Sequence, residues 1–278
     1  MGIRDRALRP GVAVSACTPY ARAVVAGVMS FAIAGCATAP NQPVQSSASL
    51  ANVFSDTNAY AEQAFSLGAL PASVRDTLNA NDVATSELSF HRITIQARSK
   101  WFKMGTDAPQ NFTEHVTYDN LGKGVIRAIS TDFSNGFTYR TEISLTYRNY
   151  VGLMMQKFAS SATAMPAVSA VLQFDRFEPA LSSDKLAYTM RSGYIGKPGL
   201  TQPWQIVCQL GRSYSGTVVN AHIAGNVREM SCQSVNANGV TTEVRDYVYL
   251  QQYGLALTRA VKSASSDYTV DLVDFKAE

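Results

Sequence analysis

The chain has 278 residues, of which 46 % are hydrophobic and 10 % aromatic, and 24 Lys and Arg against 21 Asp and Glu give a formal net charge of +3. Residues 36–278 alone hold 20 charges of each sign, and no block of five or six basic residues occurs anywhere. The sequence therefore argues against nucleic-acid binding, which needs a concentrated basic face. The 243 residues from position 36 onward are enough for one large all-β domain or two small ones.

The N-terminal segment has three parts in a fixed order. Residues 23–33 are a short uncharged apolar run, with four arginines before it (Arg4, Arg6, Arg9, Arg22) and Ala34, Gly35 and Cys36 after it. A basic flank, a short apolar stretch and small residues at its end are typical of a secretory signal. With the cysteine directly after them, residues 33–36 (Ile-Ala-Gly-Cys) resemble the lipobox of bacterial lipoproteins. The resemblance implies cleavage before Cys36, a diacylglyceryl group on its sulfur and a signal peptide of residues 1–35.

Other interpretations of this segment are an ordinary secretory signal or a membrane anchor. Residues 23–35 would make a helix of about 20 Å, whereas a bilayer core of about 30 Å needs about 20 residues. A second match ends at Cys17, but too little apolar sequence precedes that residue to engage a membrane. We therefore expect Cys17 to leave with the signal.

Residues 36–50 follow as a lipidated tether. Residues 37–50 hold two prolines and three serines and carry no charge, a composition that cannot bury enough apolar surface to fold. We expect a flexible segment with a reach of roughly 20 Å. The residue after the lipidated cysteine is Ala37, not aspartate. In Gram-negative lipoproteins that implies sorting to the outer membrane, and here a position facing the periplasm.

Residues 51–278 are predicted to form a single, mainly β domain. Its first part is the most helix-like, with helix formers at residues 59–67 and Pro71 as a first helical position for residues 71–78. From Leu88 the hydrophobic period changes to two. We expect strands at residues 89–98, 124–131 and 137–151, the last with one apolar face, and Asn135-Gly136 signals a hairpin before it. Residues 152–165 are less regular, and periodicity does not decide between strand and helix for residues 166–174.

The last third predicts seven successive strands, with glycine, proline and serine between them: residues 186–194, 204–210, 216–223, 227–232, 240–250, 255–261 and 268–275. The short connections favour antiparallel pairing. Cys208 and Cys232 lie on two of these strands with one strand between them in sequence. Two cysteines in an exported chain most often pair, and we expect a disulfide that ties neighbouring layers or edges. Two reduced core cysteines are the alternative.

The residues offer little catalytic chemistry. His91 shares a strand face with Ile93 and Ile95 and is expected to be partly buried, whereas His115 and His222 lie in other strand-like pieces without a zinc spacing. Residues 211–216 (Gly-Arg-Ser-Tyr-Ser-Gly) resemble the Gly-x-Ser-x-Gly nucleophile elbow, but their second glycine comes one position too late for it. We therefore expect a turn there. We expect no catalytic residues, no metal site and no cofactor.

Aromatic residues gather in two strand regions: Phe137, Tyr139, Tyr147 and Tyr150, and Tyr247, Tyr249 and Tyr253. Either they form an ordinary sheet core or they line an apolar cavity between the strand at residues 137–151 and the closing strands at residues 244–275. The predicted fold is an antiparallel curved sheet or partly open β-barrel with one or two short N-terminal helices. In size and strand order it resembles the half-barrel lipoprotein carriers of the bacterial envelope.

Three functions follow from these observations. The first is a non-enzymatic, membrane-tethered envelope lipoprotein that binds an apolar ligand or another envelope component. The second is a structural or assembly partner without a small ligand. The third is a cell-envelope hydrolase, which would need serine, histidine and aspartate side chains converging in a cleft.

Overall fold

The structure of the protein is a computed structural model that describes residues 49–81, 88–106, 108–178, 184–199 and 201–278. All of them belong to one compact unit. The proposed signal peptide, the lipid site Cys36 and the tether up to residue 48 lie outside the described residues.

Three short α-helices and one 3-10 turn precede the sheet: α1 (Leu50–Ser55), α2 (Thr57–Ala64), η1 (Leu67–Ala69) and α3 (Ala72–Ala80). Side chains cap the N-termini of α1 and α2. Ser49 accepts a hydrogen bond from the backbone N–H of Asn52, and Asp56 accepts one from the backbone N–H of Ala59. The helices expected at residues 59–67 and 71–78 are present with shifted ends, and Pro71 is the residue before α3, not its first residue. Helix α1 was not predicted.

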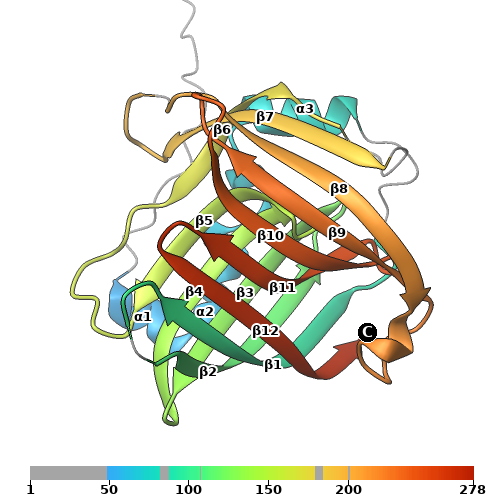
Figure 1. The fold of residues 1–278 in the computed structure, drawn as a ribbon. Helices are drawn as coiled ribbons and strands as arrows, with labels where there is room; N and C mark the ends of the chain where they lie inside the picture. The colour runs from blue at the N-terminus through green and yellow to red at the C-terminus, as the bar shows by residue number, and fades with distance from the viewer. Residues whose placement is uncertain (1–48, 82–87, 107, 179–183, 200) are drawn as a thin grey trace, which may run out of the picture. The chain divides into compact units, whose positions relative to one another are not determined.

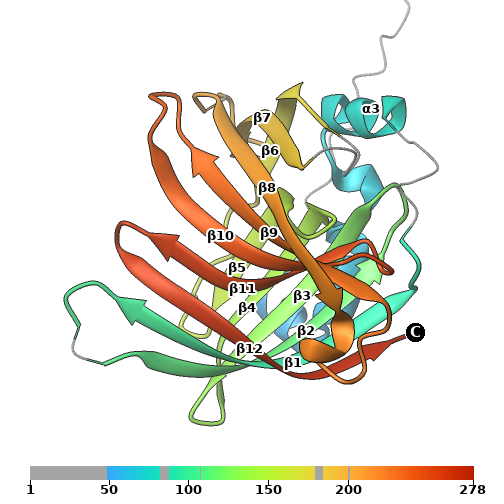
Figure 2. The ribbon, with the colours of Figure 1, turned by 45° about the vertical axis from the view of Figure 1, so that its right-hand side comes forward.

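Twelve antiparallel strands follow and close into a barrel (Figure 1). They are β1 (Arg92–Lys103), β2 (Gln110–Asn120), β3 (Val125–Ser134), β4 (Phe137–Tyr147), β5 (Val151–Ala159), β6 (Ser169–Arg176), β7 (Lys185–Tyr194), β8 (Trp204–Ser215), β9 (Asn226–Val235), β10 (Thr241–Leu250), β11 (Leu255–Ser263) and β12 (Ser266–Ala277). Each strand pairs with the next in sequence, and β12 pairs with β1 from Ile93↔Ala277 to Lys103↔Ser266. In Figures 1 and 2, strands β8 to β12 lie in front of β3 to β5. The mainly β, antiparallel prediction is confirmed.

The predicted single strand at residues 137–151 is wrong, because a turn divides it into β4 and β5. Arg148 and Asn149 have positive φ angles of 49° and 63°, which no strand residue adopts. Hydrogen bonds hold this turn against β10 and β11. Arg148 Nη1 donates to the Tyr249 hydroxyl (2.9 Å), and Asn149 Nδ2 donates to the carbonyl of Ala256 (2.8 Å).

Two further expectations are corrected in the last third. Residues 211–216 are not a turn, because β8 continues through them to Ser215. Residues 216–223 are not a strand but the 3-10 turn η3 (Gly216–Val218) and a loop. A Cβ on Gly216 would lie 2.4 Å from Ile223, so this tight fold needs glycine there. The other predicted strands are present with shifted ends.

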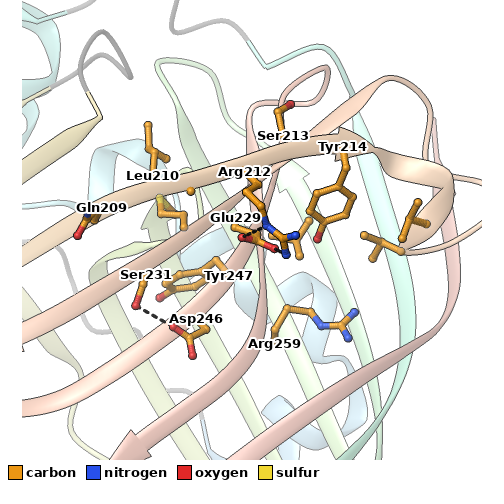
Figure 3. A pocket seen from close by; sticks show the side chains of 15 residues that line it. Gln209, Leu210, Arg212, Ser213, Tyr214, Glu229, Ser231, Asp246, Tyr247 and Arg259 are labelled. Carbon is orange, nitrogen blue, oxygen red and sulfur yellow. Dashed lines mark hydrogen bonds and ion pairs between the residues drawn. The ribbon is translucent and has the colours of Figure 1, made fainter.

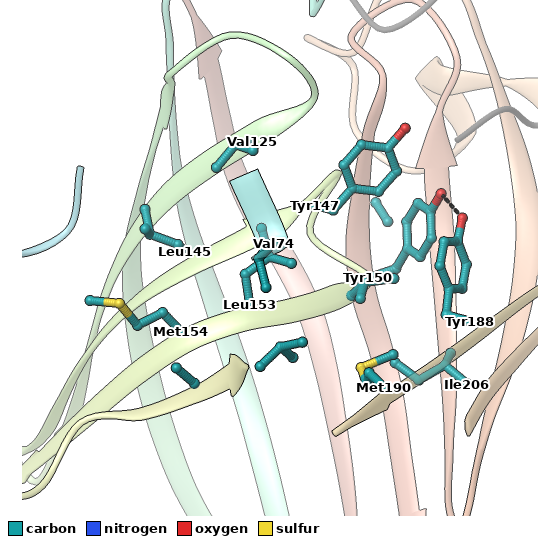
Figure 4. Packing of buried hydrophobic residues seen from close by; sticks show 14 of the residues in the cluster. Val74, Val125, Leu145, Tyr147, Tyr150, Leu153, Met154, Tyr188, Met190 and Ile206 are labelled. Atoms are coloured by element: carbon teal, nitrogen blue, oxygen red, sulfur yellow. Dashed lines mark hydrogen bonds between the residues drawn. The ribbon is translucent and has the colours of Figure 1, made fainter. Parts of the chain in front are cut away.

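The two faces of the sheet carry separate hydrophobic cores. Neighbouring residues on a strand point to opposite faces, and Val125 and Ile126 on β3, like Tyr249 and Leu250 on β10, fall in different cores. The helices cover one face and bury Phe65 and other side chains there. We call this the helix-side core, and Figure 4 shows Val74 of α3 among Leu145, Tyr147 and Leu153 in it. The opposite-face core contains Ile93, Ile126, Val248, Leu250, Leu255, Leu257 and Phe275.

Candidate functional site

An open cleft of about 820 Å³ lies across β8, β9, β10 and β11 (Figure 3). Its polar row comes from the pairing of three strands, in which Gln209 lies opposite Ser231 and Ser231 opposite Asp246. Such a row falls on one face of the sheet because directly paired residues share a face. The volume lies within the range of about 300–1,000 Å³ that is typical of small-molecule sites.

Two β-bulges carry arginines into this cleft. On β8, Gly211 and Arg212 together lie opposite the single residue Glu229, because the pairing passes from Leu210↔Met230 to Ser213↔Arg228. On β11, Arg259 is an extra residue between Thr258 and Ala260, which pair with consecutive residues of β10. Bulges redirect a side chain out of the regular alternation and occur often beside functional sites.

The two arginines differ in their partners. Arg212 forms a two-pronged ion pair with Glu229, with Nη2 2.7 Å from Oε1, and its hydrogen bonds lower the pKa of the Glu229 carboxyl. This pair is a weak one, because the Arg212 side chain is 84 % exposed. Arg259 makes no hydrogen bond or ion pair with any residue that the structure describes. The site therefore holds one partly exposed cation without a carboxylate partner among those residues.

One wall of the cleft is apolar. Val248 is 4 % exposed and belongs to the opposite-face core, and the partly buried Tyr214 and Val219 pack against that core. On the floor, Ser231 Oγ donates to Asp246 Oδ1 at 2.7 Å. Figure 3 shows Arg212, Glu229 and Arg259 gathered in one region, with Tyr214 beside them. The arrangement offers a cationic group beside an apolar surface.

The disulfide lies on the strands that build the cleft. Cys208 and Cys232 are joined and are direct partners in the β8–β9 ladder, one pair away from Gln209 and Ser231. The predicted bond is present, but the expectation that it ties layers or edges across an intervening strand is wrong. Residues 216–223 form no strand, so β8 and β9 are neighbours in the sheet.

The histidines do not come together. His91 precedes β1 and is exposed, contrary to the prediction of partial burial, and His222 lies in the loop after η3 with a 68 % exposed side chain. His115 lies on β2 against the ring of Phe133. Among the described residues there is no group of three His, Cys, Asp or Glu that would hold a metal ion. In the same part of the chain, no helix is long and apolar enough to cross a membrane.

The aromatic residues do not line one cavity. Tyr147, Tyr150, Tyr247 and Tyr249 lie in the helix-side core, where the hydroxyls of Tyr150 and Tyr188 are 2.9 Å apart (Figure 4). Tyr253 lies in the opposite-face core, and Phe137 is 78 % exposed. The prediction of an apolar cavity between residues 137–151 and the closing strands is therefore wrong. Ile143 and Leu145 belong to one core, whereas Val248 and Leu257 belong to the other.

Sequence reasoning missed the cleft because its arginines depend on bulges. Residues 211–216 begin and end with glycine, and the structure gives a reason for the first of the two. A Cβ on Gly211 would lie 3.0 Å from the Cβ of Glu229, so glycine allows the close approach at the bulge. Nothing in the alternation of β11 marks Arg259 as an inserted residue.

No protein-family model matches the chain, and no curated protein matches it in sequence. Among solved structures, a β-barrel-like protein of the domain of unknown function DUF1849 from Brucella abortus is 8 % identical, with 68 % of this chain and 98 % of that chain covered and a TM-score of 0.41. A DUF1329 family protein from Desulfovibrio piger is 6 % identical, with coverages of 73 % and 90 % and a TM-score of 0.36. A LolA superfamily protein from Nitrosomonas europaea is 10 % identical, with coverages of 73 % and 93 % and a TM-score of 0.32. Likeness at this level supports no conclusion about the ligand or activity of this chain.

Proposed function

We propose that the mature protein is a non-enzymatic envelope lipoprotein, anchored through Cys36 to the periplasmic side of the outer membrane, whose β8–β11 cleft binds a small ligand with an apolar part and an anionic group. The single observation that carries the ligand class is Arg259, a cation on a bulge beside the apolar wall of an 820 Å³ cleft. Arginine binds carboxylates and phosphates with two parallel hydrogen bonds, which suits an anionic head group.

Binding is favoured over covalent chemistry by the side chains around the cleft. No histidine or cysteine lines it among the described residues. The Ser213 hydroxyl donates to the carbonyl of Val227, and the Ser231 hydroxyl donates to Asp246. Neither serine has a histidine beside it among the lining residues, so the cleft lacks the serine–histidine pair of the common hydrolases.

The ligand class is tested by titration calorimetry with dodecyl phosphate below its micelle concentration and with dodecyltrimethylammonium as the charge control. We expect the phosphate to bind and the ammonium compound not to. Arg259→Gln should weaken phosphate binding about tenfold or more, since a hydrogen bond to a charged group is worth about 1.5–3 kcal/mol. Lys262→Gln, a loss of the same charge on exposed β11 surface, is the matched control.

Equal weakening by both substitutions would refute the cleft as the binding site. If neither amphiphile binds to a folded protein, the role of a structural or assembly partner without a small ligand replaces this proposal.

The anchor rests on the lipobox at residues 33–36 and is tested separately. Labelled palmitate should enter the wild-type protein and the Cys17→Ser variant but not Cys36→Ser. Equal labelling of all three proteins would remove Cys36 as the lipid site.

A further inference from the structure

Large exposed apolar side chains gather at one end of the strands. We call this the odd-strand end, because β1, β3, β5, β7, β9 and β11 finish there. Nine large apolar side chains are well exposed in the described part of the chain, and only Val218 and Val273 lie towards the other end. Four of the nine lie at or beside the turns of two neighbouring hairpins, β1–β2 and β3–β4: Phe102 (38 % exposed), Met104 (56 %), Phe137 (78 %) and Tyr139 (46 %). Single exposed apolar residues are ordinary, but a cluster at turns, which are usually polar, marks an interaction surface.

These side chains are presented on ordered strands. The ring of Tyr139 lies 5.0 Å from that of Phe112, which is 8 % exposed, and Phe137 pairs with Ser134 at the last position of the β3–β4 hairpin. Phe102 pairs with Asp267 near the last position of the β1–β12 ladder. The apolar groups therefore project from the tips of a barrel that holds them in place.

Basic residues accompany the apolar ones. Arg98, Lys100 and Lys103 on β1 are all exposed, and Lys262 on β11 is exposed on the same part of the barrel. The carboxylates that face them are Asp271, opposite Arg98, and Asp267, opposite both Phe102 and Lys262. At the tips of β1, β11 and β12, four cations therefore face two carboxylates, which makes this part of the odd-strand end positive. Aromatic and basic side chains together are typical of surfaces that lie in the head-group region of a bilayer.

The chain enters the domain at this end. Phe54 of α1 lies 6.0 Å from Phe158, the residue before the last of β5, and Phe54 is itself 45 % exposed. Twelve residues separate Cys36 from Ser49, and a fully extended chain over these thirteen steps spans at most about 45 Å. A lipid on Cys36 would therefore hold the bilayer within reach of the odd-strand end.

We propose that the odd-strand end docks on the surface of a bilayer that contains anionic phospholipid. Phe102, Met104, Phe137 and Tyr139 enter the head-group region, while Lys100 and Lys103 lie against the phosphates. The inference rests in part on the proposed anchor. It adds an orientation, in which this end of the barrel faces the membrane and the η3 end faces away from it.

The test uses the mature protein in vesicles of phosphatidylcholine and phosphatidylglycerol. An environment-sensitive fluorophore is placed at Phe137→Cys, and at Val218→Cys as the control, since Val218 is 74 % exposed at the other end. Nitroxide-bearing lipid should quench the label at position 137 and leave that at 218 unaffected. Equal quenching of the two labels, or none at position 137, would overturn the proposal.

An independent readout leaves the four apolar docking residues in place. Brominated phospholipid should quench Trp101, next to Phe102, in the Trp204→Phe variant. Lys100→Gln with Lys103→Gln should weaken the docked state about fivefold per lysine on vesicles with phosphatidylglycerol and leave quenching unchanged on phosphatidylcholine alone. Lys276→Gln is the control at the other end. Unquenched Trp101, or the same lysine effect on both vesicle types, would contradict docking on anionic lipid.

The mass of the N-terminal peptide separates this inference from the anchor. A lipidated protein whose position 137 stays unquenched refutes the docking surface and leaves the anchor intact. Quenching at position 137 without a lipid on Cys36 supports the surface and refutes the anchor.

Discussion

Removal of the disulfide should lower the stability of the domain by an amount that chain entropy sets. Cys208 and Cys232 are 24 residues apart and are 0 % and 3 % exposed. Closing a loop of about 25 residues restricts the unfolded chain by about 3.5 kcal/mol. Alanine is the replacement of choice, because serine would bury two hydroxyl groups in the helix-side core. For a domain of this size, 1 kcal/mol moves the melting temperature by about 2–4 °C, so we expect a decrease of about 7–14 °C.

The assay is thermal unfolding of the wild type and of the Cys208→Ala/Cys232→Ala variant, each with and without dithiothreitol. The reductant should lower the melting temperature of the wild type towards that of the variant and should leave the variant unchanged. A variant with the same melting temperature as the wild type would refute the reasoning. It would mean that the bond does not restrict the unfolded chain more than the β8–β9 hairpin already does. An equal loss in both proteins on reduction would assign the effect to the reductant.

Two further predictions concern a buried carboxyl and a tight turn. Glu114 is 7 % exposed, and burial raises the pKa of its carboxyl despite the hydrogen bond from Tyr268. Its contribution to stability is therefore present below the unfolded pKa of about 4.3 and is lost as the pH rises through the folded pKa. Glu114→Gln should be more stable than the wild type in urea at pH 8 and lose this advantage at pH 4; a difference independent of pH would contradict this. Gly124 has a φ of +72°, and a Cβ there would lie 2.6 Å from the ring of Tyr147. Gly124→Ala should cost about 1–3 kcal/mol in urea unfolding, and an unchanged midpoint would show that the turn relaxes.

Local pattern was sufficient for most of the sheet. The alternation that predicts β1 and β4 lies within each strand's own residues. The hairpin between β3 and β4 was predicted from Asn135-Gly136 alone, and these two residues have positive φ angles of 52° and 81°. The disulfide also followed from the sequence, since Cys208 and Cys232 are the two cysteines left once Cys17 is expected to leave with the signal and Cys36 to carry the lipid. The strand at residues 137–151 was misread for an identifiable reason. Tyr147 and Val151 have the same parity, so a three-residue turn between them leaves the alternation undisturbed.

The sequence by itself determined that this is a mainly antiparallel β chain with helices at its start, because period-two alternation and turn residues act over a few positions. Only the tertiary structure decided which apolar faces meet. Ile143 and Val248 are equally apolar strand residues, but the helices cover the face of the first, and the second packs in the opposite-face core. The same holds for the cleft. Whether Arg212 and Arg259 follow the alternation or leave it depends on the register of the neighbouring strand, and a strand's own residues do not encode the register of its partner.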